Sequence, residues 1–258
     1  MSTVEAWAKE FVLSTDLGLK LAPPPVPKTW EEAPLSCRLP RPGRPPELGT
    51  TARAPKSPGQ GALRSPERRA ELVHTFLHHE LQAAELMAWA LLAFPETPRA
   101  FRRGLLGVLA DEVRHMGLYR DHLMSLGFTY GSFPVRDWFW ERVPSCPTAA
   151  HFTALMGMGF EGGNLDHTQR FAKRLRAAGD ARGAELEEQI GEEEIPHVRF
   201  ALAWFQKWTQ DDSFSGWTRH LVPPLTPSVM RGQPINRESR LRSGMSQRFI
   251  DDLAAWSG

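Results

Sequence analysis

The chain has 258 residues, of which 41% are hydrophobic, and its formal net charge is +1. This length allows one sizeable core with additional segments, and this charge argues against a strongly basic nucleic-acid binder. No apolar run reaches the roughly 18 residues that a membrane-spanning helix needs. Met1 to Glu5 lack the basic region that opens a signal peptide. Cys37 and Cys146 are far apart and are expected to be reduced thiols, so we expect a cytoplasmic protein without a membrane partner.

Residues 1–64 are predicted to form an N-terminal region of their own. Apolar residues at helical spacing predict a short helix over 3–14, with Ser2 as its cap. The rest is a wrap rich in Pro and Arg, in which the prolines exclude helix. Trp30 and Leu35 suggest that part of this wrap packs as extended chain. Its arginines are expected to be solvated, and a polyanion site is the alternative.

Residues 65–210 are predicted to form four long helices. Ser65 before Pro66 and Thr97 before Pro98 provide the cap and the first-turn proline that open a helix. Glycines that end helices and a capping aspartate mark the later boundaries. The expected ranges are 65–94, 97–127, 148–178 and 180–209, with an aromatic-rich connector over 128–147 that includes Trp138, Phe139 and Trp140.

The tail, residues 211–258, contains Pro-rich turns and is expected to end in a short helix over 247–255. Phe249, Ile250 and Leu253 share one face of that helix.

Two Glu-x-x-His pairs stand on the apolar faces of these helices. Glu112 and His115 form the first pair, and Glu194 and His197 form the second. Residues i and i+3 share one face of a helix, so each pair presents a carboxylate beside an imidazole. A core that accepts such groups must neutralise them, and a metal ion does so for several groups at once.

Each pair has a further apolar-face carboxylate upstream. Glu80 precedes Glu112 by 32 positions, and Glu161 precedes Glu194 by 33. The two halves therefore form an internal repeat, the arrangement of four-helix bundles that hold two metal ions between carboxylates. The predicted fold is an all-α four-helix bundle with a carboxylate-bridged di-metal site. For each ligand alone, the alternative is a buried polar residue satisfied by its neighbours.

The predicted metal ligands share a donor chemistry that favours iron or manganese. Carboxylates with only two imidazoles suit Fe or Mn better than Zn or Cu. Two Fe ions are expected, with Mn or mixed Fe/Mn as the alternatives. The ligand set is Glu80, Glu112, His115, Glu161, Glu194 and His197.

Three residues are candidates for supporting the ligands. Asp111 could orient His197, and Glu193 could orient His115, because ligand histidines usually donate their second N–H to a carboxylate; solvated helix acids are the alternative. Tyr119 lies one turn after His115 and could donate a hydrogen bond near the metals or pack in the core.

Four polar or irregular features remain near the ligands. Glu85 and Asp166 each follow a ligand by five residues, and salt bridges are expected there rather than metal ligation. Pro196 removes a helical hydrogen bond and predicts a kink or bulge in its helix. Glycines surround Glu161, which indicates close backbone packing or room for O2 and substrate, the alternative being a weakened ordinary helix. They are Gly157, Gly159, Gly162 and Gly163.

The chain resembles the ferritin-like superfamily, and more narrowly its bacterial domain-of-unknown-function family related to the tRNA hydroxylase MiaE. The segments that carry this resemblance are 79–86, 111–115, 160–161 with 164–166, 179–180 and 194–198. The resemblance implies a di-iron bundle and O2-dependent oxidation, and it implies no particular substrate.

These observations predict an oxidoreductase, a di-iron oxygenase or oxidase. Its expected partners are O2, a small-molecule or modified-residue substrate and an electron donor. An iron-oxidising or storage protein is the first alternative, and a helical protein that binds partners through its Arg- and Pro-rich arms is the second. A tRNA substrate, by analogy with MiaE, receives little support from a net charge of +1.

Overall fold

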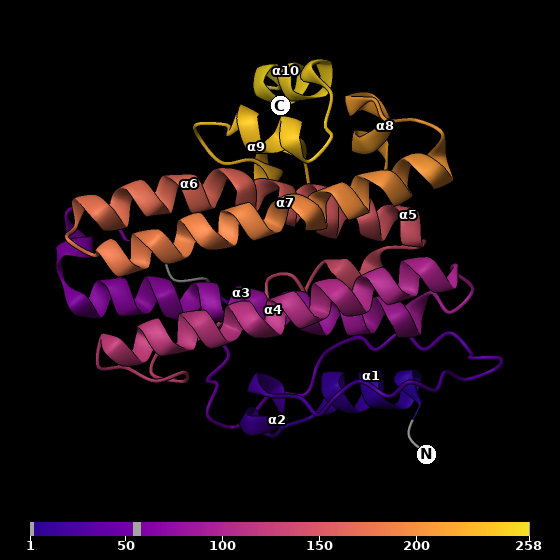
Figure 1. Ribbon diagram of the computed structural model, residues 1–258, viewed down its shortest axis with the longest axis horizontal. Coiled ribbons are helices and arrows are strands. Elements are labelled where there is room, and N and C mark those ends of the chain that lie inside the picture. Colours follow the sequence, from indigo (N-terminus) through magenta and orange to yellow (C-terminus); the bar gives the residue numbers. More distant parts are fainter. Residues whose placement is uncertain (1–2, 54–57, 258) are drawn as a thin grey trace. The chain divides into compact units, whose positions relative to one another are not determined.

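The computed structural model describes residues 3–53 and 58–257. The chain divides into two compact units, Met1–Pro144 and Ser145–Gly258. Each unit is built around two long helical segments joined by a short loop (Figure 1). An isolated parallel bridge joins Thr50 to Val135, and the described residues contain no longer β-structure. The predicted all-α class is confirmed for this part of the chain.

The first unit contains the helices that carry the first Glu-x-x-His pair. Helices α3 (Pro66–Ala93) and α4 (Arg99–Ser125) pack together, and we call them the first hairpin. Helix α1 (Val4–Leu13) packs against α3, and the short α2 (Leu17–Leu21) contacts α4. A 3-10 turn, Ala62–Arg64, precedes α3.

Prolines and glycines set the ends of these helices, with some differences from prediction. Thr3 caps α1 by accepting from the Ala6 N–H at 3.1 Å, whereas Ser2 lies outside the described residues. Ser65 is the N-cap residue of α3, but its side chain makes no capping hydrogen bond. Thr97 does not cap α4, because its hydroxyl donates instead to the Phe94 carbonyl at 2.7 Å.

The N-terminal wrap is attached more firmly than its composition indicates. Leu35 is 88% exposed, so the prediction that it packs is wrong. Trp30 does pack, since the guanidinium groups of Arg99 and Arg102 lie over its ring. Arg44 is largely shielded from solvent in an ion-pair network, which corrects the expectation that the arginines of the wrap are all solvated.

The second unit carries the second Glu-x-x-His pair. A short α5 (Ala149–Phe152), a π-helix η3 (Thr153–Glu161) and α6 (Gly162–Ala177) follow one another without a break. Together with α7 (Ala181–Thr209) they form what we call the second hairpin. Asp180 caps α7 by accepting from the Gly183 N–H at 2.8 Å, as predicted.

The bulge predicted at Pro196 is absent, and a π-helix is present in a different helical segment. Helix α7 is α-helical throughout and contains Pro196 without a π-bulge. The π-helix instead precedes Glu161, where the wide turn is packed closely by its neighbours. A Cβ on Gly157 would overlap Ala201 Cβ, and one on Gly163 would lie 2.9 Å from the Met230 carbonyl oxygen. Close backbone packing thus accounts for these glycines.

The C-terminal tail covers the second hairpin from one side (Figure 1). It comprises α8 (Phe214–Arg219), η4 (Pro227–Met230), α9 (Arg237–Arg242) and α10 (Gln247–Ala255). Helix α10 has the predicted bounds, and its three predicted apolar residues are buried.

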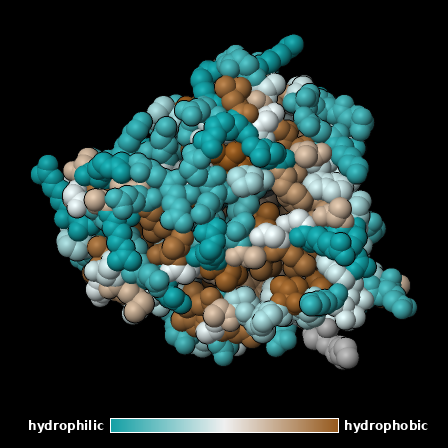
Figure 2. All heavy atoms as spheres, in the orientation of Figure 1, coloured by the Kyte–Doolittle hydropathy of each residue, from teal (hydrophilic) through white to brown (hydrophobic). Residues whose placement is uncertain are grey.

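Polar residues occupy most of the face in Figure 2, with apolar residues showing between them. Within 3–53 and 58–257, no helix has both the length and the apolar character needed to cross a bilayer.

Candidate metal centre

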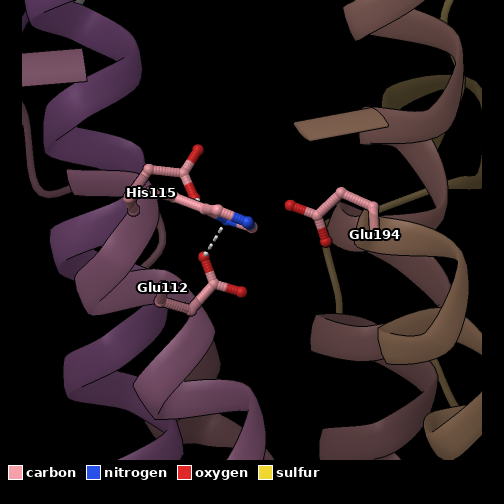
Figure 3. Close-up of side chains that lie close together, drawn as sticks. Glu112, His115 and Glu194 are labelled. Carbon is pink, nitrogen blue, oxygen red and sulfur yellow. Dashed lines mark ion pairs between the residues drawn. The ribbon is translucent and has the colours of Figure 1, made fainter. Parts of the chain in front are cut away.

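Three predicted ligands of the first hairpin come together in its core. Glu80 projects from α3, and Glu112 and His115 project from α4. The imidazole Nδ1 of His115 lies 3.5 Å from Glu80 Oε2 and 3.6 Å from Glu112 Oε2. Figure 3 shows the second of these ion pairs. All three side chains are buried, so the hairpin encloses two carboxylates around one imidazole.

The charges within this triplet depend on one another. Burial and the neighbouring Glu112 raise the pKa of Glu80 well above its ordinary value. Burial disfavours the charged form of His115, but Glu112 and Glu80 outweigh it and raise the pKa of this imidazole to about 11. In the protein alone, a proton on the imidazole therefore offsets part of the negative charge. A metal cation would offset that charge with the imidazole neutral.

The donor atoms also have a separation that suits one ion. Two atoms bound to the same ion at about 2.1 Å lie at most about 4 Å apart. Ligand atoms of Glu80, Glu112 and His115 lie within 4.8 Å of one another, and the closest approaches of His115 to each carboxylate are shorter than 4 Å. The first hairpin thus holds a buried Glu/His group that could hold a metal.

The second hairpin brings together its Glu-x-x-His pair. His197 Nδ1 lies 2.9 Å from Glu194 Oε2, and both side chains are buried on α7. Asn164, from α6, donates its side-chain N–H to Glu194 Oε1 at 3.2 Å. Figure 3 also labels Glu194. The sequence repeat did not indicate Asn164, because only acids and histidines were sought as ligands.

Glu161 stands apart from this pair. It is buried at the end of the π-helix, but among the described residues of the second unit it does not form a group of three ligand atoms with Glu194 and His197.

The candidate supporting residues have local partners. Asp111 pairs with Arg114 at 3.2 Å near the surface, and Glu193 accepts from the Gln189 amide at 3.1 Å. Their predicted roles toward the histidines stay predictions. Tyr119 is buried and its ring packs against Phe76 with centroids 5.7 Å apart, as the core-packing interpretation requires.

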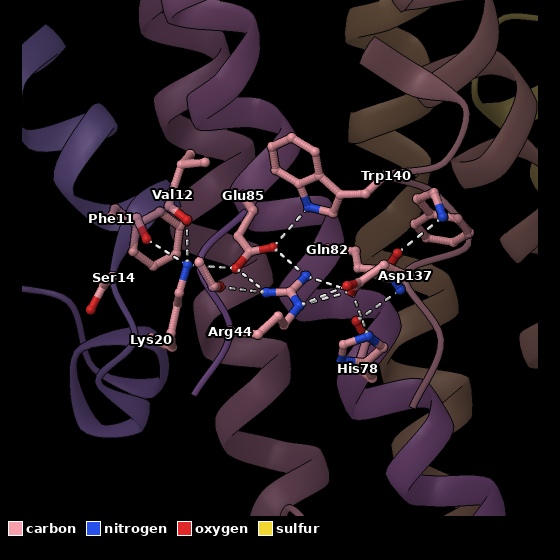
Figure 4. A network of polar contacts seen from close by, with 12 residues as sticks. Phe11, Val12, Ser14, Lys20, Arg44, His78, Gln82, Glu85, Asp137 and Trp140 are labelled. Carbon is pink, nitrogen blue, oxygen red and sulfur yellow. Dashed lines mark hydrogen bonds and ion pairs between the residues drawn. The ribbon is translucent and has the colours of Figure 1, made fainter. Parts of the chain in front are cut away.

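Glu85 is the centre of a buried ion-pair network (Figure 4). Arg44 donates to both of its carboxylate oxygens at 2.6 and 2.8 Å, and Lys20 donates to Oε1 at 2.7 Å. The indole N–H of Trp140 donates to Oε2 at 2.8 Å. Burial would raise the pKa of Glu85, but Arg44 and Lys20 outweigh it and hold this pKa below its ordinary value. The predicted salt bridge at Glu85 is present.

The network continues to a partly exposed acid. Arg44 also donates to Asp137, and His78 Nε2 lies 3.1 Å from the same carboxylate. His78 Nδ1 lies 2.7 Å from the Tyr130 hydroxyl. This network fastens the N-terminal wrap and the loop after α4 to the outer face of α3.

Asp166 is the centre of a similar buried network in the second unit, where it attaches the C-terminal tail to α6. Arg240, from α9, donates to both of its oxygens at 3.1 and 2.8 Å. The backbone N–H groups of Gly232 and Asn236 donate to the same carboxylate at 3.0 and 2.7 Å. The salt bridge predicted at Asp166 is therefore present, and it joins the tail to α6.

Fold and site define an all-helical protein with a buried Glu/His group able to hold a metal. The chain belongs to the family DUF455, "Protein of unknown function (DUF455)", whose model matches residues 5–251. It is similar to a protein of Haemophilus influenzae printed as "Uncharacterized protein", with 25% identity over 212 residues that cover 77% of this chain and 72% of that protein. No solved structure matches the chain.

Proposed function

We propose that this chain is a non-haem di-iron oxidoreductase that uses O2 to oxidise or hydroxylate an organic substrate. The observation that carries the proposal is the buried triplet of Glu80, Glu112 and His115 in the first hairpin. A second buried Glu-x-x-His pair in the second hairpin, Glu194 and His197, supports it.

In this proposal the two hairpins form one ferritin-like four-helix bundle, related to that of MiaE. The first hairpin supplies one metal position and the second hairpin supplies the other. Glu161, which is buried at the end of the π-helix, completes the second position. Iron is the metal proposed, with Mn or mixed Fe/Mn as alternatives, because the donors are mostly carboxylates. The six proposed ligands are Glu80, Glu112, His115, Glu161, Glu194 and His197.

The side chains of this chain hold the metals and restrict water. When bound, iron supplies the electrons and the open coordination positions that O2 reduction requires. Glu112, His115 and Glu194 are fully buried, so the chemistry takes place away from bulk water. An external electron donor balances a hydroxylation, since the substrate provides only two of the four electrons that O2 accepts. The substrate proposed is a small molecule or a modified residue.

Metal analysis combined with O2 uptake tests this proposal. We expect about two Fe or Mn per chain after expression with iron, and less than half of that in Glu112→Ala and in His197→Ala. The reduced protein should consume O2. Stoichiometric zinc without a redox response in the wild type would reject the di-iron assignment. Absence of any bound metal would favour a non-catalytic helical interaction protein.

Aerobic titration with Fe(II) separates an oxygenase from an iron-handling protein. An oxygenase oxidises iron only to about two per chain, followed by stopped-flow absorbance. A ferroxidase shares the ligands but oxidises many irons in turn. Sustained oxidation of tens of irons per chain would therefore replace the oxygenase proposal with iron handling and leave the ligand assignment unchanged.

A further inference from the structure

Two histidine rings from separate segments of the second unit lie beside each other. His151 is on α5, and His220 follows the last residue of α8. The centroids of their rings are 5.0 Å apart, and the ring planes are tilted by 55°. Both residues are half-buried, so solvent reaches the pair. Neither histidine belongs to the buried Glu/His group of the candidate metal centre.

The backbone determines which nitrogen of His220 can bind an ion. Its Nδ1 lies 2.8 Å from the Gly216 carbonyl oxygen, and because a carbonyl only accepts, Nδ1 must carry the proton of this contact. In the neutral ring, Nε2 then has an unprotonated lone pair. Histidines that bind a metal usually donate their other ring N–H in this way, often to a backbone carbonyl. The Phe205 ring packs edge-on against His220, with centroids 5.0 Å apart, and limits its rotation.

His151 has a similar local partner. Its Nδ1 lies 2.8 Å from the Thr148 hydroxyl, which also accepts from the backbone N–H of His151 at 3.4 Å. A hydroxyl oxygen has two lone pairs, so it can accept from Nδ1 as well, and Nε2 then carries the lone pair that binds an ion. Burial, and then His220, lower the pKa of His151, and a neutral imidazole is the form that binds metals.

The spacing of the two rings suits one shared ion. Two imidazoles bound through nitrogen at about 2.1 Å, with an angle near the tetrahedral value, have ring centres about 5 Å apart. The observed separation of 5.0 Å matches this spacing. Within 3–53 and 58–257, no third His, Cys, Asp or Glu forms a ligand group with the pair, so water completes the coordination. Imidazole donors without carboxylates suit zinc, nickel or copper better than manganese.

We propose that His151 and His220 form an additional metal site, which binds one divalent ion of the zinc, nickel and copper class through their Nε2 atoms. The bound ion links the start of the second hairpin to the C-terminal tail. This site differs from the candidate metal centre in its donors, and it does not rest on the proposed function.

Calorimetric titration of the full-length protein with Zn2+ at pH 7.5 tests this inference. The wild type should show a binding event of about one ion per chain at this site. His151→Gln and His220→Gln should each weaken that event by more than the roughly 10-fold typical of losing an outer hydrogen-bond partner, because each removes a ligand. The double variant should lose no more than either single variant, since one ring alone cannot chelate. Zn2+ bound at the buried ligands contributes equally in every variant, so the comparison isolates this pair.

His167→Gln is the matched control. His167 is another half-buried histidine of the second unit, on α6, and its replacement should leave the Zn2+ titration unchanged. Circular dichroism checks the folding of each variant. If His220→Gln does not fold because Phe205 loses its ring contact, His220→Phe keeps an aromatic ring there and takes its place in the comparison.

Two outcomes would overturn the inference. The first is a wild-type titration that the histidine variants reproduce. The second is a set of losses that add up in the double variant, because they would indicate two independent surface histidines. Wild-type protein that binds Zn2+ at this pair but no iron or manganese would reject the proposed function and leave this site in place.

Discussion

The two hairpins carry the same motif but position it by different means. In the first, two regular α-helices place Glu80, Glu112 and His115 together. In the second, a π-helix ends at Glu161, and among the described residues of the second unit this carboxylate does not form a group of three ligand atoms with Glu194 and His197. A repeat in motif spacing therefore does not ensure a repeat in geometry, because loop length and helix type decide which residues face each other.

The hairpins agree more closely in how they attach the rest of the chain. Glu85 follows Glu80 by five residues, and Asp166 follows Glu161 by five. Both acids are fully buried and both accept two hydrogen bonds from an arginine outside the hairpin. Buried salt bridges of the same kind thus attach the N-terminal wrap and the C-terminal tail to their hairpins. Glu85 pairs with two cations, Arg44 and Lys20, whereas Asp166 pairs with one, Arg240.

Removal of the arginine from either buried salt bridge should have the largest effect on stability. Arg240→Met leaves Asp166 buried with only neutral donors, so we expect a loss of about 3–5 kcal/mol in unfolding free energy. Arg44→Met should cost less, about 2 kcal/mol, because Lys20 still pairs with Glu85. Urea unfolding followed by circular dichroism measures both.

Arg242→Met is the control for that comparison. Arg242 lies on the same helix as Arg240, but it pairs with Glu192 at the surface. Its replacement should leave the unfolding midpoint nearly unchanged. Equal effects of Arg240→Met and Arg242→Met would show that the buried pair is not what fastens the tail.

Metal removal should have the next largest effect. Both hairpins have long apolar cores outside the ligands, so the apo protein should remain helical. It should unfold more easily, by about 3 kcal/mol for two ions at a free metal concentration about 10 times the Kd, because only the folded state binds the ions. Thermal melts with and without a chelator measure this difference. An apo protein without helical circular dichroism would contradict the expectation.

Much of the fold could be predicted from local signals. Gln247–Ala255 was predicted with its observed bounds, because Phe249, Ile250 and Leu253 mark one apolar face of the helix. Periodicity could not distinguish a π-helix from an α-helix over 153–161, since nearly every residue of this segment is buried and no polar face marks the period. Pro196 predicted a bulge that is absent, because α7 continues as an α-helix through this proline despite the one N–H donor that it lacks.

The site was predictable where helices are regular. Glu80, Glu112 and His115 follow from the 3.6-residue period alone. Asn164, which donates to Glu194, was missed, because a neutral amide is not among the residue types expected to ligate a metal in this pattern. Arg44 and Arg240 were missed as partners, because each lies in a separate segment more than 40 residues from its acid in sequence.

Substitution of one glycine by alanine in each hairpin compares how tightly the two hairpins are packed at these positions. Gly157→Ala would place a Cβ against Ala201 Cβ in the second hairpin, so we expect a loss of about 1–3 kcal/mol. Gly107→Ala in α4 meets nothing within 4 Å and should stabilise by about 0.5–1 kcal/mol through helix propensity. Urea unfolding measures both changes. A stabilising Gly157→Ala would mean that the π-helix has room that its contacts do not indicate.

The smallest expected effect concerns pH, and one histidine with a lowered pKa is compared in each unit. Burial, and then His78, lower the pKa of His74 to about 4, and burial, and then Arg170, lower that of His167 to about 4. His74 is almost fully buried and its Nε2 accepts from the Gly131 N–H at 2.9 Å, whereas His167 is half-buried.

A depressed pKa of this kind weakens the fold in mild acid. An unfolded histidine has a pKa of about 6.5, so the unfolded state takes up protons first as the pH falls from about 6.5 to about 4. Stability at pH 7.5 is thus progressively lost over this window.

His74→Gln keeps an acceptor for Gly131 but cannot titrate, so it should retain about 1–2 kcal/mol that the wild type loses between pH 7.5 and 5.0. His167→Gln should retain less, because solvent reaches that ring. Urea unfolding at the two pH values gives each difference with the pH 7.5 value as its own control. An equal loss in wild type and His74→Gln would mean that the acid sensitivity of the first unit arises elsewhere.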